Sequence, residues 1–152
     1  MLWLTGPATI RSHIVPALSA AATAAGRPAP RVVCLLPVCV TDHADEARAA
    51  AAKIFELYGT LPNYRAVLDR EGAEGPADVA IIGTEEQVVT RIREIFTAGA
   101  TEFVGTLFTG GESAARTRAL LAELAARIRS KVVDVIGKSG QQSMWSRNAG
   151  GQ

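Results

Sequence analysis

The feature that most constrains the fold is the run from Arg31 to Val40, in which every residue after Arg31 is apolar. A run of this kind is typical of a strand buried on both faces, as in a parallel sheet covered by helices. Pro37 lies within the run and removes one backbone donor, which predicts a bulge or a local break in the strand.

Strand and helix patterns alternate along the rest of the chain. Strands are predicted at Leu2–Thr5, Arg31–Val40, Asp78–Ile82 and Thr101–Phe108. Helices are predicted at Pro7–Ala25, from Asp42 to about Tyr58, at Leu61–Arg70, from Thr84 to Ala98, and after Gly110-Gly111. This alternation predicts right-handed βαβ units, a parallel sheet and the α/β class.

Several residues predict where the helices begin and end. Gly26 ends the first helix and Asp42 caps the second, while Thr84 and Gln87 have the spacing of a capping box. Pro16 predicts a kink, or a short first helix before the main one. Residues 1–130 form the predicted domain, and residues 131–152 are predicted to be an irregular or disordered tail.

Charge and hydropathy exclude several classes of partner. The formal net charge is +1 and no Lys/Arg run exceeds two residues, so we expect no nucleic-acid partner. No apolar run approaches the roughly 18 residues of a membrane span, and the N-terminus lacks the basic region of a signal peptide.

Cys34 and Cys39 are the two cysteines of the chain, five residues apart in the same predicted strand. Their side chains then point to opposite faces, so we expect no disulfide between them. Two buried, reduced thiols indicate a cytoplasmic location.

Ligands of parallel βα folds bind at the loops that follow the strands. The loop Thr5-Gly6-Pro7-Ala8-Thr9 combines a glycine, a proline at a helix start and two hydroxyls, and Gly83-Thr84 is a shorter version. Free N–H groups at such helix starts are able to hold a phosphate. Ordinary helix capping explains the same residues, and neither a Walker A motif nor G-x-G-x-x-G is present.

Catalytic candidates are few. His13 and His43 are far apart in sequence and have no further ligand at metal-binding spacing, so no metal site is predicted. The acidic residues, including Asp42 and Glu85, fall in first turns of helices, where they complement the helix dipole. Arg116 is predicted to lie on a solvated helix face. No catalytic residue is assigned.

Seven segments, in this order and spacing, resemble the luciferase-like monooxygenase superfamily and, within it, the branch of deazaflavin (coenzyme F420)-dependent oxidoreductases. They are Trp3–Pro7, His13–Leu18, Ala25–Val33, Pro37–Asp42, Tyr64–Gly72, Ile82–Val88 and Ala98–Phe103. The resemblance implies the C-terminal half of a TIM-type (β/α)8 barrel, from the end of strand 5 to helix 8, and thus a truncated family member.

The resemblance also implies a function. Members carry out hydride transfer or monooxygenation on a small-molecule substrate with F420 or, alternatively, FMN, and the cofactor supplies the chemistry. The loop after strand 5 holds the phosphate-bearing part of the cofactor, which implies cofactor-binding roles for Thr5, Gly6 and Thr9. Gly83 and Thr84 match the loop after strand 7, near the same mouth of the barrel.

Two alternatives remain open from the sequence. A catalytically inactive half-barrel acts at most as a binding or self-associating module, because open sheet edges and an exposed inner face favour a homo-oligomer. A complete four-stranded doubly wound domain is the other. The sequence specifies neither the substrate nor the choice between F420 and FMN.

Overall fold

The computed structural model describes residues 1–127. The chain divides into two compact units, the first comprising Met1–Thr117 and the second beginning at Arg118. Residues 111–117 of the first unit and residues 118–127 of the second are helical. The predicted tail, 131–152, lies outside the described residues.

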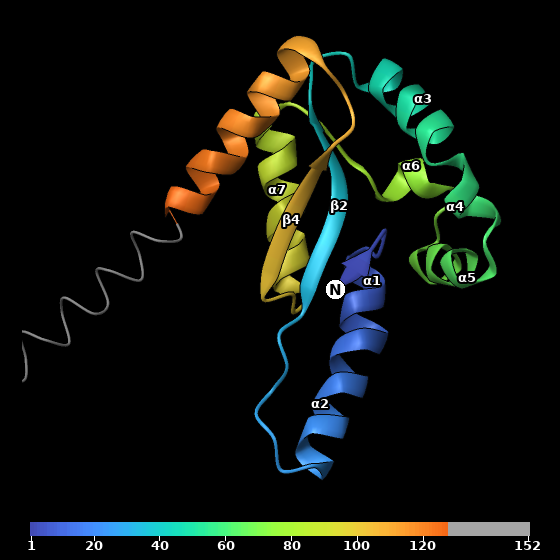
Figure 1. Ribbon diagram of the computed structural model, residues 1–152, viewed down its shortest axis with the longest axis vertical. Helices are drawn as coiled ribbons and strands as arrows, with labels where there is room; N and C mark the ends of the chain where they lie inside the picture. Colours follow the sequence, from blue (N-terminus) through green and yellow to red (C-terminus); the bar gives the residue numbers. More distant parts are fainter. Residues whose placement is uncertain (128–152) are drawn as a thin grey trace, which may run out of the picture. The chain divides into compact units, whose positions relative to one another are not determined.

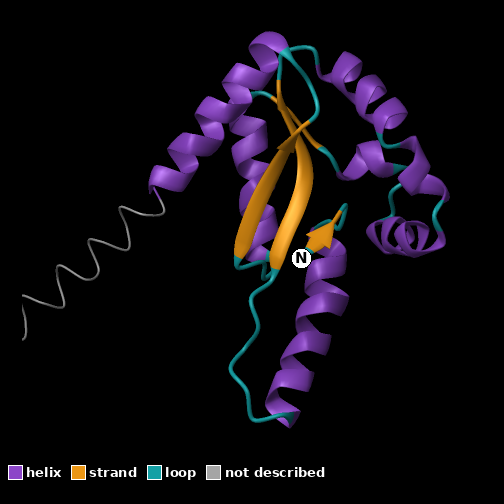
Figure 2. Ribbon diagram, in the orientation of Figure 1, coloured by secondary structure: helices purple, strands orange, loops and turns teal. Residues whose placement is uncertain are grey.

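The first unit has four strands, labelled in Figure 1 where there is room: β1 (Leu2–Trp3), β2 (Val33–Val40), β3 (Ile81–Gly83) and β4 (Glu102–Leu107). Between them lie α1 (Pro7–Thr9), the π-helical turn η1 (Ile10–Ile14), α2 (Val15–Ala24), α3 (Ala44–Ile54), α4 (Glu56–Thr60), α5 (Pro62–Glu71), α6 (Pro76–Val79) and α7 (Glu85–Thr97). Figure 2 shows that helices and strands alternate along the chain. All strand pairs are parallel, so the predicted class is confirmed.

β2 is the centre of the sheet. β4 pairs with it from Val33 to Val38, and β3 pairs with it from Val38 to Val40. Because Val38 pairs with both β3 and β4, these two strands lie on opposite edges of β2. Leu35 likewise pairs with both β1 and β4. β1 and β3 therefore share one edge of β2, at its start and its end.

This order departs from that of consecutive barrel strands. In a (β/α)8 barrel each strand pairs with its predecessor, so β4 would pair with β3. Here β4 pairs with β2 instead. The described strands thus form a parallel α/β sheet, but their pairing is not that of an arc cut from a closed barrel.

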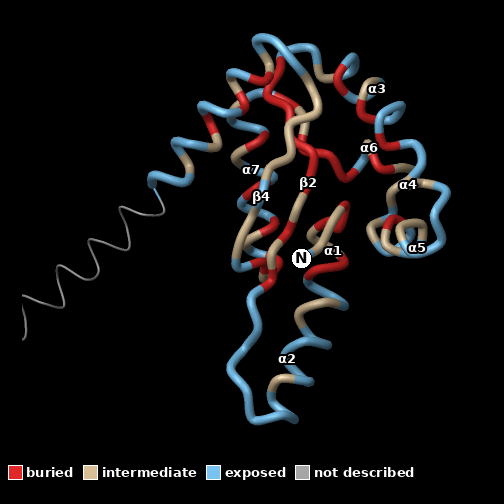
Figure 3. Tube along the Cα trace, in the orientation of Figure 1, coloured by how far each residue is buried: buried red, intermediate tan, exposed pale blue. Residues whose placement is uncertain are grey.

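The core is built around β2, as its apolar composition predicts. Residues 36–40 of β2 are all buried, and α7 packs against the sheet with Val88, Ile92 and Ile95 buried. Figure 3 shows the contrast with α2, which buries none of its residues. The side chains of Cys34 and Cys39 are buried and unpaired, which confirms the prediction of two buried thiols.

The predicted break at Pro37 is wrong, because β2 is continuous. The Leu4 N–H donates to the Leu35 carbonyl, and the Thr41 N–H donates to the Gly83 carbonyl on the same edge. Alternate residues direct their backbone groups to one edge, so Pro37 faces this edge too. Its missing N–H falls between the last pair of β1 with β2, at Leu35, and the first pair of β3 with β2, at Val38.

Several helix boundaries differ from those predicted. Pro16 is accommodated by η1, in which the Val15 N–H donates to the Ile10 carbonyl five residues back, the wide turn of a π-helix. The predicted helix to Tyr58 is divided at Phe55 into α3 and α4. Gly26, predicted to end the first helix, follows α2 with a left-handed backbone, φ +61°.

Candidate functional site

The first predicted phosphate loop already holds an anion supplied by the chain itself. β1 ends at Trp3, and Leu4, with φ +53°, turns the backbone toward the helical run that begins at Pro7. The N–H groups of Ala8 and Thr9 donate to the two carboxylate oxygens of Glu71, at 3.2 and 2.6 Å. The start of α1 therefore binds a carboxylate as helix N-termini bind anions.

Gly6 makes this contact possible. A Cβ atom at Gly6 would lie 2.5 Å from Oε2 of Glu71 and 2.7 Å from its carboxyl carbon. The glycine thus leaves the space that the anion occupies, as expected where backbone must approach a ligand closely.

The hydroxyls of the loop differ in their partners. The Thr5 hydroxyl donates to the Trp3 carbonyl at 3.2 Å. The Thr9 hydroxyl is fully buried and has no hydrogen-bond partner among the described residues. A buried hydroxyl without a partner costs about 1–3 kcal/mol, so the loop has one buried polar group that the described contacts leave unused.

A cavity adjoins the loop. Its volume is about 360 Å³, within the ordinary range for ligand pockets. Gly6, Pro7 and Ala8 line it together with Glu71, and Arg91 supplies a cation that also pairs with Glu94 at 3.6 Å.

Cys34 lies against this site without being reactive. Its thiol donates to the Thr5 carbonyl at 3.4 Å. Burial and then the nearby carboxylate of Glu71 raise the pKa of the Cys34 thiol to about 12. The thiolate is therefore scarce at neutral pH, and Cys34 is not a nucleophile.

The second predicted loop, Gly83-Thr84, is used for capping. The Thr84 hydroxyl accepts from the Gln87 N–H at 3.5 Å, and the Thr84 N–H donates to the Gln87 side chain at 3.0 Å. The predicted capping box is confirmed. Glu85 and Glu86 in the first turn of α7 already supply negative charge to the helix dipole.

The structure does not bring the two loops to one mouth. Trp3 at the end of β1 pairs with Leu35, whereas Gly83 at the end of β3 pairs with Val40. Five residues of strand separate these levels, about 16 Å at the usual rise. Thr5, Gly6 and Thr9 therefore lie together at one level, with Gly83 and Thr84 at another.

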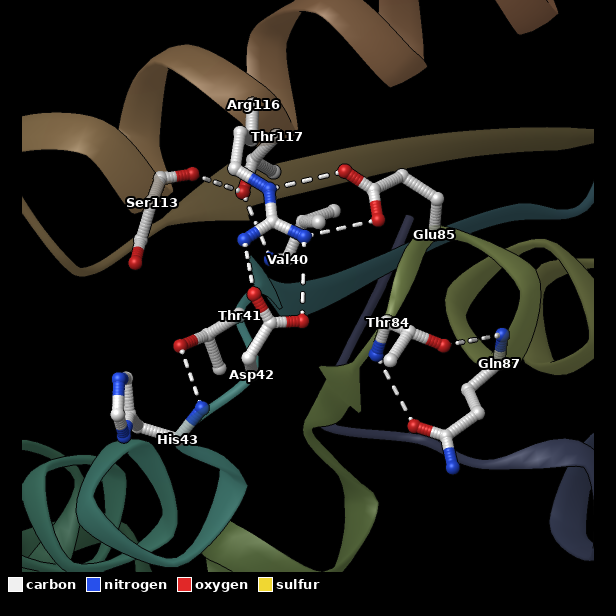
Figure 4. Close-up of polar contacts among 10 residues, drawn as sticks. All are labelled: Val40, Thr41, Asp42, His43, Thr84, Glu85, Gln87, Ser113, Arg116 and Thr117. Atoms are coloured by element: carbon white, nitrogen blue, oxygen red, sulfur yellow. Dashed lines mark hydrogen bonds and ion pairs between the residues drawn. The ribbon is translucent and has the colours of Figure 1, made fainter.

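An ion-pair cluster occupies the carboxyl end of β2 and β3. Figure 4 shows Arg116 between two carboxylates, those of Asp42 and Glu85. Its guanidinium donates to Glu85 at 2.9 Å through two nitrogens and to Asp42 at 2.8 Å. These bonds raise the pKa of Arg116 and lower the pKa values of Asp42 and Glu85.

Two sequence predictions are corrected at this cluster. Asp42 does not cap α3; the N-cap is His43, whose N–H donates to the Thr41 hydroxyl. Arg116 is not on a solvated face but binds partners 31 and 74 residues away. No pattern of neighbouring residues predicts such long-range ion pairs. Since both carboxylates neutralise Arg116, this cluster offers no free cation for a phosphate.

Glu71 binds the N–H groups of the first loop, and it was not among the site residues predicted from the sequence. It ends α5, where the helix dipole disfavours a negative charge. That unfavourable position was the one local signal that the carboxylate has a partner elsewhere.

Within residues 1–127, no three His, Cys, Asp or Glu side chains gather as a metal site, and no helix is long and apolar enough to cross a membrane.

These features define a parallel α/β protein whose strand-to-helix loop accepts an anion. The model of the luciferase-like monooxygenase family matches residues 1–102 of the 152 residues, so the chain belongs to that family. Membership indicates an oxidoreductase or monooxygenase activity, and members use a flavin or F420. Comparison with curated proteins and with solved structures gave no match.

Proposed function

We propose that the chain is an oxidoreductase of the luciferase-like type that binds F420, or alternatively FMN, through the loop from Thr5 to Thr9. The family match supports the class of reaction. The observation that carries the binding site is the carboxylate held by the N–H groups of Ala8 and Thr9. Phosphate and carboxylate are both anions that such N–H groups accept.

The residues present fit a phosphate-bearing cofactor. Gly6 leaves room for an oxygen against the backbone, and the two N–H groups donate to it. The Thr9 hydroxyl is buried and has no partner among the described residues, and in this proposal it rotates to donate to the bound phosphate. The bound deazaflavin or flavin would supply hydride transfer or oxygen chemistry. The protein's part here is to fix the phosphate end, and with it the position of the ring.

Titration of the purified chain with F420 and with FMN, at low salt and followed by cofactor fluorescence, tests the proposal. We expect saturable binding of one of them, weakened about tenfold by Thr9→Ala, or about 1.4 kcal/mol. Thr9→Ala is expected to leave the free energy of unfolding unchanged or raised, because the hydroxyl lost has no described partner. A change in binding then does not reflect misfolding.

Thr5→Ala is a second test of the same loop, and Thr97→Ala is the matched control. Thr97 is exposed and bonds only to the Arg93 carbonyl in the described contacts, at the far end of α7. Absence of binding by folded chain, or equal binding by Thr9→Ala, Thr5→Ala and Thr97→Ala, would contradict the proposed site.

A second candidate function is a catalytically inactive binding or self-associating module. β4 pairs only with β2 among the described strands, and Val104 on it is 45% exposed. An unpaired strand edge is a template for pairing with another chain. Sedimentation showing a concentration-dependent dimer, together with no cofactor binding, would favour this function over the first.

A further inference from the structure

We propose that Glu71 regulates the anion-binding loop by occupying it, so that a phosphate-bearing ligand binds only by displacing the Glu71 carboxylate. The phosphate nature of that ligand rests on the proposed function. The competition itself rests on the contacts of the described residues, and it applies to any anion that uses the same N–H groups.

The Glu71 carboxylate fully occupies the two N–H groups at the start of α1. Both oxygens of Glu71 are used, one by Ala8 and one by Thr9, across more than sixty residues of sequence. An N–H group that donates to a carboxylate at 2.6 Å is not free for a second anion. Two negatively charged groups also repel each other at this distance. A ligand phosphate and the Glu71 carboxylate therefore exclude each other.

The start of the helical run and the space at Gly6 together have the shape of an anion site. The helical run that begins at Pro7 continues through α1, η1 and α2 to Ala24, so the N–H groups lie at the start of a long helix. Gly6 leaves a space that a Cβ would fill, and the carboxylate lies in that space. The buried Thr9 hydroxyl has no partner among the described residues even with Glu71 in place. Glu71 thus satisfies only part of the loop.

Glu71 lies at the end of its own helix that disfavours a negative charge. It is the last residue of α5 and is followed by Gly72, whose φ is +69°. A negative charge there gains nothing from its own helix. The adjoining cavity of about 360 Å³ offers space beside the loop for the displaced side chain or for the ligand. In this proposal, movement of the Glu71 side chain frees the two N–H groups for the ligand.

The experiment compares inorganic phosphate binding to the wild-type chain, Glu71→Gln and Glu71→Ala, followed by the backbone amide resonances of Ala8 and Thr9. Glu74→Gln is the matched control, because Glu74 is exposed and the change removes the same charge three residues away. Gly6→Ala is a second variant: its Cβ fills the space in which the carboxylate lies, so we expect it to exclude phosphate as well as Glu71 and to show no phosphate-dependent change at Ala8 and Thr9.

We expect Glu71→Gln and Glu71→Ala to bind phosphate at least tenfold more tightly than the wild type. The backbone amide resonances of Ala8 and Thr9 should change their chemical shifts as phosphate is added. Glu74→Gln should behave as the wild type. Equal phosphate affinity in the wild type and the Glu71 variants would overturn the proposal. So would the absence of any shift at these amides in folded Glu71 variants, because the loop would then not be an anion site.

Parallel titrations with F420 and FMN separate this inference from the proposed function. If Glu71→Gln gains phosphate affinity but binds neither cofactor, the competition stands and the cofactor assignment fails. If the wild type binds a cofactor while the Ala8 and Thr9 resonances remain those of the Glu71-bound form, the cofactor binds elsewhere on the chain, and both the loop as its site and the competition fail.

Discussion

The Thr117 hydroxyl is predicted to hold the end of β2 in place. Its Oγ1 accepts from the Val40 N–H at 2.8 Å and donates to the Ser113 carbonyl at 2.6 Å (Figure 4). β4 pairs with β2 only as far as Val38. Thr117 therefore supplies the acceptor that the sheet no longer offers to a fully buried N–H group.

Thr117→Val keeps the size and the β-branch of the side chain and removes the acceptor. Val40 then retains a buried donor without a partner, which costs about 1–3 kcal/mol. Helix propensities of Thr and Val are nearly equal, so they add little. Against a typical domain stability of about 5–15 kcal/mol, the loss is easily measured.

Urea unfolding followed by circular dichroism measures the change, with Thr117→Ser as the control that keeps the hydroxyl and loses a methyl group. We expect Thr117→Val to be the less stable variant and the Val40 amide to exchange faster in it. If packing rather than the hydrogen bond mattered, Thr117→Ser would be the less stable. That reversed order, or an unchanged Val40 exchange rate, would refute the reasoning.

Two further predictions concern charges and thiols. Arg116→Met should lower the urea midpoint at pH 7, because Arg116 holds the pKa values of Asp42 and Glu85 below their ordinary 3.8 and 4.5. The stability that comes from a lowered carboxyl pKa is fully present above the ordinary pKa and is lost as the pH falls through the pKa of the folded state. The difference in urea midpoint between the wild type and Arg116→Met should therefore be smaller at pH 3 than at pH 7. An equal difference at both pH values would contradict this. Both thiols of the native chain should resist a disulfide reagent at pH 8 and react in urea, since both are buried and the pKa of Cys34 is raised to about 12; rapid labelling of native Cys34 would show that the interior around β1 opens readily.

Features carried by neighbouring residues were predicted well. The buried run of β2, the capping box of Thr84 and Gln87, and the helix end at Gly26 each depend on residues close in sequence. The parallel class followed from the alternation of strands and helices. The loop around Gly6 was singled out from its composition; its N–H groups bind the chain's own Glu71 carboxylate, and its binding of a phosphate stays a prediction.

The features that failed depend on residues far apart in sequence. Asp42 was expected at a helix cap, but its carboxylate instead binds Arg116, 74 residues away. Pro37 was expected to break β2, but the strand continues because the proline faces a gap between β1 and β3.

By itself the sequence determined most of the segments that form strands and helices, because hydrophobic spacing and capping act over a few residues. The predicted strand Asp78–Ile82 is an exception, since Asp78 and Val79 lie in α6 and β3 begins at Ile81. Only the tertiary structure decided that β4 pairs with β2 and that Glu71 reaches the start of α1. Any parallel strand offers the same ladder of backbone groups, so the choice of neighbour depends on how the helices pack. In the same way, an anion site accepts whichever carboxylate the fold brings within reach, and that is settled in three dimensions.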